Sequence, residues 1–122
     1  MFDVTSGEAR LLLDIALMAT GRNRFKSAET ILSALDEFRP DSEQLAVARM
    51  ILSISKGDFQ AAVDFADGMA LVKHPTSAMI KVFKGMALLR LERPSVAKNV
   101  LEEVVAQADD PVAAQLAKDM MI

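Results

Sequence analysis

Apolar residues recur along this chain at three- and four-residue spacing, the pattern of amphipathic helices. Glycine or proline interrupts the pattern at intervals of roughly 16 to 19 residues, the length of one helix and a short turn. The interruptions are Gly21, Pro40, Gly57, Pro75, Pro94 and Pro111. The pattern therefore predicts an all-α protein with no strand. The seven expected helices are 6–21, 24–38, 42–56, 59–72, 76–91, 94–108 and 111–121.

Three of these helices begin with residues that can cap a helix. Thr5 with Glu8 and Asp41 with Gln44 have the spacing of a capping box, in which two side chains satisfy each other's backbone N–H groups. Asp110 precedes Pro111, which fits an N-cap followed by proline at the first helical position.

A short motif recurs with a nearly constant period. Phe25-Lys26-Ser27-Ala28 and Phe59-Gln60-Ala61-Ala62 lie 34 residues apart, and Pro94-Ser95-Val96-Ala97 follows after 35. This period, together with the Gly-Asp-aromatic turn at 57–59, resembles the tetratricopeptide repeat. We therefore expect an α-solenoid of three degenerate tetratricopeptide-like helix pairs in a single domain, 1–122. The expected units are about 6–40, 42–75 and 76–109, with a C-terminal capping helix, 110–122.

Small residues should lie where the helices of a pair cross closely. They are Ala16, Ala28, Ala62, Gly85 and Ala97. Larger apolar residues should fill the space around them: Leu12, Ile15, Leu32, Leu35, Leu88, Leu101 and Val104, with Met18, Met50 and Met69 as core filler. Arg49 and Lys84 stand where the repeat commonly has leucine, and Trp and Tyr are absent, so the repeats are degenerate.

The composition of the chain argues against several classes of function. The 122 residues carry 14 Lys+Arg against 17 Asp+Glu, a formal charge of -3, which argues against a nucleic-acid binder. The absence of Cys and the single His exclude disulfide scaffolds, thiol catalysis and His- or Cys-based metal centres. Because no apolar run has the length of a membrane span, we expect a cytoplasmic protein that does not insert into membranes.

The candidate chemical groups favour structural roles. His74 is flanked by Lys73 and Pro75 and is expected in an exposed turn. Glu102 and Glu103 diverge on their helix, and Asp109 and Asp110 are expected to start the last helix. The cluster of Arg22, Arg24 and Lys26 fits a solvated face, with an acidic partner helix as the alternative. The sequence predicts no enzyme, with no catalytic residue, metal site or cofactor.

A stripe of apolar residues on the first helix of each pair is the candidate binding site. In tetratricopeptide stacks these helices line a concave groove, and an apolar groove suits an amphipathic partner helix. The nine residues, called here the groove stripe, are Leu13, Leu17, Val47, Ile51, Ile54, Met79, Val82, Met86 and Leu89. Two alternatives stay open: the last helix folds back into the groove, or the stripe is displaced by one residue.

The first unit resembles a known family. The segment Leu12–Gly21 followed by Ala28, and the later turn 56–59, resemble the type III secretion needle-subunit chaperones of the YscG/PscG type over about residues 8–70. The resemblance implies a tetratricopeptide fold that holds an amphipathic helix of a secreted, polymerising needle subunit. It also implies a small helical co-chaperone and a ternary complex in the bacterial cytoplasm.

Two other interpretations remain. The segment Phe38-Arg39-Pro40-Asp41-Ser42 followed by the turn at 57–58 resembles the Hrp-type secretion proteins of plant pathogens. Alternatively, the chain is a scaffold or self-assembling structural protein without a client. A chaperone whose apolar groove is empty is expected to form a homodimer or to be poorly soluble.

Overall fold

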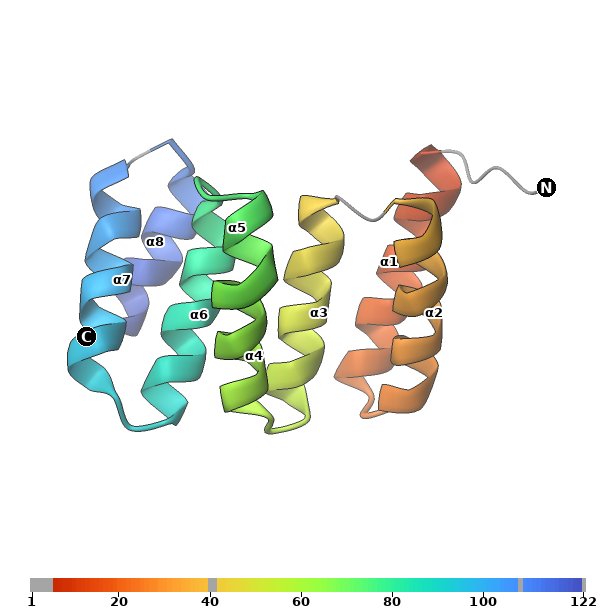
Figure 1. Ribbon diagram of the computed structural model, residues 1–122, viewed down its shortest axis with the longest axis horizontal. Coiled ribbons are helices and arrows are strands. Elements are labelled where there is room, and N and C mark those ends of the chain that lie inside the picture. Colours follow the sequence, from red (N-terminus) through yellow and green to blue (C-terminus); the bar gives the residue numbers. More distant parts are fainter. Residues whose placement is uncertain (1–5, 40–41, 108, 122) are drawn as a thin grey trace. The chain divides into compact units, whose positions relative to one another are not determined.

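The computed structural model describes residues 6–39, 42–107 and 109–121, and these are helical apart from short turns (Figure 1). No strand occurs in these ranges, so the expected all-α class is confirmed there. The α-helices are α1 (Ser6–Gly21), α2 (Phe25–Phe38), α3 (Glu43–Ser55), α4 (Phe59–Phe65), α5 (Leu71–Lys73), α6 (Ala78–Arg90), α7 (Pro94–Gln107) and α8 (Pro111–Met120). A π-helical turn, η1 (Ala66–Ala70), joins α4 to α5.

The helix boundaries follow from capping side chains. The Asp110 carboxylate accepts a hydrogen bond from the Ala113 N–H at 3.1 Å, with Pro111 in the first turn, which confirms the predicted start of α8. Helix α3 begins one residue later than predicted, because the Ser42 hydroxyl accepts from the Leu45 N–H at 3.2 Å. The predicted capping residues Thr5 and Asp41 lie outside the described residues.

The π-helical turn interrupts what the sequence predicts as one continuous helix over 59–72. In this turn the backbone is wider than in an α-helix, and the Leu71 N–H bonds to the Ala66 carbonyl five residues earlier. Asp67 and Gly68, two weak helix formers, lie inside it. The periodicity of apolar residues does not reveal such a turn, since it adds one residue without ending the helix.

The backbone turns in the same way after three helices. Asn23, Gly57 and Glu92 all have positive φ, at 60°, 82° and 59°, each two residues before the next helix starts. After α1 the Arg24 N–H bonds to the Ala19 carbonyl at 2.8 Å, and after α6 the Arg93 N–H bonds to the Leu88 carbonyl at 3.0 Å. These bonds reach five residues back, as in a Schellman motif. The turn backbone thus repeats with the spacing of the sequence motif.

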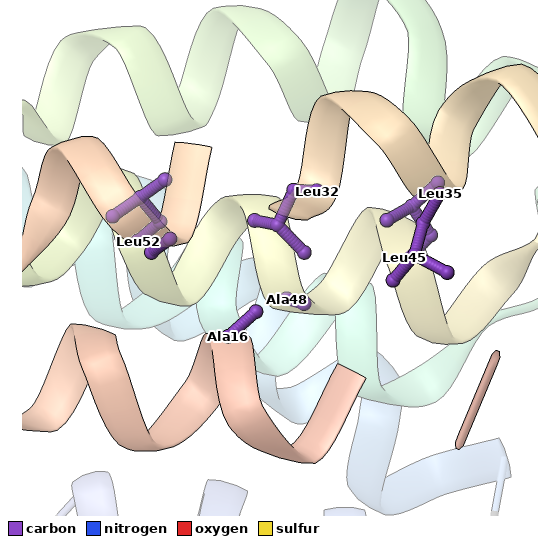
Figure 2. Close-up of a cluster of buried hydrophobic side chains, with 7 residues drawn as sticks. Ala16, Leu32, Leu35, Leu45, Ala48 and Leu52 are labelled. Carbon is purple, nitrogen blue, oxygen red and sulfur yellow. The ribbon is translucent and has the colours of Figure 1, made fainter. Parts of the chain in front are cut away.

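The chain divides into two compact units, of which unit 1 ends at Gly57 and unit 2 begins at Asp58. In unit 1, helices α1, α2 and α3 pack against one another. Figure 2 shows their shared cluster, in which Ala16 on α1 points toward α3. Its buried members are Ala16, Ala28, Leu32, Leu35, Leu45, Ala48 and Leu52. The predicted crossing residues Ala16 and Ala28 are therefore buried, as expected.

In unit 2, helix α6 packs against α4, α7 and α8. A Cβ added to Gly85 would lie 2.6 Å from Cδ2 of Leu101 on α7, so only glycine permits this close crossing. Ala62 and Ala97, the other predicted crossing residues of this unit, are fully buried. The buried cluster of this unit consists of Ala78, Val82, Leu101, Val104, Ala113 and Ala117.

The boundary between the compact units falls inside the second predicted repeat, 42–75, between α3 and α4. The single domain and the three repeat units stay predictions. The helix pairs α1–α2 and α6–α7 each make extensive contacts within one compact unit.

Candidate binding surface

The groove stripe is divided between the two units, with five residues in unit 1 and four in unit 2. Leu13 and Leu17 lie on α1, Val47, Ile51 and Ile54 on α3, and Met79, Val82, Met86 and Leu89 on α6. Eight of these nine side chains are partly exposed, although all are large and apolar.

In unit 1 the stripe follows helix faces that the core leaves partly uncovered. Leu13 and Leu17 pack against the buried cluster from its border. On α3 the cluster uses Leu45, Ala48 and Leu52, whereas the stripe residues recur at 47, 51 and 54, a separate face of the same helix. Solvent therefore reaches apolar side chains on both helices of this unit.

In unit 2, Val82 does not lie at the surface. Its side chain is 0% exposed and belongs to the buried cluster. The reason is its spacing from Ala78 and Gly85, which places it on the face of α6 that packs against α7. Met79, Met86 and Leu89 remain partly exposed, and Met79 and Leu89 border the cluster.

A second apolar stripe lies on α1, and two of its three residues were assigned wrongly from the sequence. Leu11, Ile15 and Met18 are 61%, 42% and 60% exposed and recur at i, i+4 and i+7 on α1. We call them the outer α1 stripe. Ile15 and Met18 were expected in the core, but α1 is apolar around much of its circumference, so periodicity alone does not show which face is buried. Met69, also expected as core filler, is 52% exposed, whereas Met50 is buried.

The charged residues that depart from the repeat pattern are paired. Arg49 lies 4.0 Å from the Asp36 carboxylate, and Lys84 lies 2.6 Å from that of Asp67.

Lys81 is buried, and its ammonium group contacts Glu103 at 2.8 Å and the Gln107 side-chain oxygen at 3.3 Å. The sequence analysis did not predict this ion pair and hydrogen bond between α6 and α7, because the residues next to Lys81 in the sequence do not distinguish it from an exposed lysine.

The structure also describes the surroundings of the histidine and the charged residues that the sequence analysis considered as chemical groups. His74 is half-buried in the turn after α5, where its backbone N–H donates to the Ala70 carbonyl. Glu102 pairs with Lys98 and Glu103 with Lys81. Arg22, Arg24 and Lys26 are exposed. Among the described residues no group of three or more His, Asp or Glu is arranged to hold a metal ion.

Unit 1 also contains a cleft of about 240 Å³ where the start of α1, the end of α2 and the start of α3 meet. Leu13, Leu35 and Leu45 line it together with two arginines, Arg10 and Arg39. Sequence reasoning did not find this cleft, because its two arginines are 29 residues apart (39 − 10) and come together only in the folded unit.

None of the helices in the described ranges combines the length and the hydropathy that crossing a membrane requires. No family model, curated protein or solved structure matches this chain.

Proposed function

We propose that this protein is a non-enzymatic export chaperone of type III secretion. It binds an amphipathic helix of a polymerising, needle-like subunit and keeps that subunit monomeric in the bacterial cytoplasm. The architecture proposed for it is an α-solenoid of three degenerate tetratricopeptide-like pairs, with the last helix as a cap. The same left-handed backbone conformation recurs at Asn23, Gly57 and Glu92, and this recurrence supports a repeated helix pair.

One observation carries the proposed binding role. Eight large apolar residues of the groove stripe are partly exposed and recur at helical spacing on α1, α3 and α6. Apolar side chains left in contact with water at this spacing match the anchors of an amphipathic helix at i, i+3 or i+4 and i+7. Met79 and Met86 add flexible side chains that adapt to a partner's shape.

The proposed mechanism is burial. A polymerising subunit exposes the apolar face with which it would contact its next copy, and the chaperone covers that face instead. Each large side chain that is buried contributes roughly 1.5–3 kcal/mol. A few anchors therefore supply affinity in the micromolar range or tighter after the cost of association. A small helical co-chaperone is part of the proposal, as the family resemblance implies.

The test is co-expression with a type III secretion needle subunit, the class of client named in the proposal. Ile51→Asp puts a charge into the proposed contact, where desolvating it costs several kcal/mol. In the free chaperone this partly exposed position meets water, so the fold should persist. Val112→Asp, at a highly exposed site on α8, is the matched control. We expect co-purification to be lost with Ile51→Asp and kept with Val112→Asp; retention by both variants would exclude the stripe as the client site.

A second candidate function has its own supporting observation. The outer α1 stripe exposes three large apolar residues on one helix face, and such a patch favours a self-associating scaffold. A scaffold is soluble and assembles without a client, whereas an empty chaperone gains solubility when its partner is present.

A further inference from the structure

The exposed apolar face of α1 ends at a turn that carries positive charge. The outer α1 stripe, Leu11, Ile15 and Met18, follows one face of this helix. After the helix ends, the Arg22 N–H still donates to the Met18 carbonyl at 3.1 Å, the bond of an α-helix. Arg22 therefore lies one turn beyond Met18 on the same face, and an apolar surface adjoins a cation on one side of unit 1.

This turn is a local excess of positive charge. Arg22, Arg24 and Lys26 are exposed, and no hydrogen bond or ion pair engages their side chains within the part of the chain that the structure describes. The segment 15–28 contains no acidic residue, although the formal charge of the whole chain is -3. The next acidic side chain, Glu29, is already paired with a lysine at 2.6 Å. The three cations therefore remain available to a partner.

The backbone of this turn is fixed and does not itself require positive charge. Asn23 has φ of 60°, and the Arg24 N–H bonds to the Ala19 carbonyl at 2.8 Å. The turn after α6 has the same backbone, but there Glu92 occupies the position of Asn23 and precedes Arg93. The three cations of the first turn are therefore not needed to form it, and its fixed backbone lowers the cost of ordering them against a partner.

We infer that the outer α1 stripe and this cationic turn together bind an acidic amphipathic helix of a partner protein. Apolar anchors of that helix at i, i+3 or i+4 and i+7 cover the stripe. Carboxylates about one turn further on meet the arginines, whose guanidinium groups match them. The distance from Leu11 to Arg22 along the helix is about 16 Å, so a partner helix of about three turns spans both parts. This surface uses other residues of α1 than the groove stripe does, and the inference does not depend on the proposed chaperone function.

Two other occupants fit this face less well. A second copy of this chain offers little complementary charge, since residues 9–28 contain four cations and a single acidic residue, Asp14. Self-association through the stripe is therefore weak, whereas an acidic helix adds ion pairs to the same apolar contact. An anionic membrane complements the turn, but Asp14 is exposed next to Ile15 and would lie against negative headgroups.

The test uses two designed peptides with the full chain labelled at its isoleucine and methionine methyl groups. Each peptide is an alanine-based helix of about 20 residues with leucines at i, i+4 and i+7. The acidic peptide has three glutamates in the turn after the leucines, and its neutral match has glutamines there. We expect the acidic peptide to shift the methyl signals of Ile15 and Met18 saturably. It should bind about fivefold to tenfold more tightly than the neutral peptide, since exposed ion pairs are added, and about 1 M salt should remove most of the difference.

Variants of the chain test the turn and the stripe separately. Arg22→Gln combined with Arg24→Gln should weaken binding of the acidic peptide by about threefold to fivefold and leave the neutral peptide unaffected. Arg93→Gln, at the equivalent position of the turn after α6, is the matched control and should bind as the unchanged chain does. Leu11→Ser should weaken binding of both peptides, whereas Val112→Ser, at another highly exposed apolar site, should not. Circular dichroism checks that each variant is folded.

Two further measurements address the other occupants. We expect the chain to stay in the supernatant when vesicles of phosphatidylcholine and phosphatidylserine are pelleted, and we expect the acidic peptide to reduce self-association in sedimentation velocity. The inference would be overturned by equal binding of the two peptides, by methyl shifts confined to Ile51 and Met86 of the groove stripe, or by unchanged affinity of the double arginine variant. Pelleting with the vesicles, or self-association that the peptide does not reduce, would overturn it in favour of a membrane or of a second copy.

Discussion

At the scale of single residues, we expect substitutions at two left-handed turn positions to change the free energy of unfolding in opposite directions. Glu92 has φ of 59°, where a side chain costs roughly 1 kcal/mol, whereas Gly57 occupies φ of 82° without that cost. Glu92→Gly should therefore raise the free energy of unfolding by about 0.5–1 kcal/mol, and Gly57→Ala should lower it by about 1 kcal/mol. Urea denaturation measures both. Changes of the same sign in the two variants would contradict this reading of the turns.

Gly85 tests the close crossing of α6 and α7. In Gly85→Ala the new methyl group would overlap Cδ2 and Cγ of Leu101, which is fully buried and packed within the cluster of unit 2. Overpacking of this kind costs about 1–3 kcal/mol, which outweighs the gain of up to about 1 kcal/mol from replacing a helical glycine. Thermal denaturation should show a lower Tm.

The control for this substitution is Gly21→Ala. Nothing lies within 4 Å of a Cβ at Gly21, and its φ is not positive. The variant should therefore be neutral or more stable by up to about 1 kcal/mol. If Gly85→Ala were as stable as Gly21→Ala, the crossing would be looser than described.

The sequence predicted the small buried residues better than the large ones. Ala28, Ala62 and Ala97 are buried as expected, because a repeated alanine at fixed spacing has few explanations other than a close crossing. The position of Val82 was wrong, and so was that of Met18, because both lie on helices with apolar residues on several faces. Which of those faces is covered depends on neighbouring helices, and local periodicity contains no information about them.

At the scale of elements, α8 provides the clearest prediction. Ala113 and Ala117 are fully buried in the same cluster as Val82, Leu101 and Val104, and α8 packs against both α6 and α7. Removing residues 110–122 should expose this cluster and lower the Tm by several degrees or cause aggregation. Differential scanning calorimetry and light scattering check it. An unchanged melting curve with a monodisperse product would show that α8 does not stabilise unit 2.

Helix positions were predictable because their signals are local. Breakers, caps and apolar spacing placed the helix ends within two residues of those observed, apart from the interruption at 66–70. The π-helical turn was missed because it adds one residue without ending the helix, and Asp67 and Gly68 alone are compatible with an ordinary helix.

At the scale of the whole molecule, the outer α1 stripe predicts concentration-dependent self-association of the isolated protein. Leu11→Lys combined with Met18→Lys places two like charges in that patch and should keep the protein monomeric. Val112→Lys, another highly exposed apolar position, is the control and should behave like the unchanged chain. Sedimentation velocity across a concentration series distinguishes them. A monomer at every concentration in the unchanged protein would remove the support for a scaffold.

The groove stripe was the part of the candidate site least accessible from the sequence. Its nine residues were chosen by periodicity, and for eight of them the partial exposure agrees with a surface role. Whether they form one continuous groove depends on how the two units are arranged. That arrangement is not encoded in the spacing of apolar residues along single helices.

The central claim is that this chain keeps a polymerising subunit monomeric by covering its apolar helix. The most direct measurement is a sedimentation assay of a type III secretion needle subunit, the proposed class of client, with and without an equimolar amount of this chain. We predict that the subunit alone forms polymers that pellet, and that in the mixture it stays in the supernatant as a soluble complex of defined mass. A subunit that pellets equally in both samples, or that stays monomeric on its own, would contradict the account.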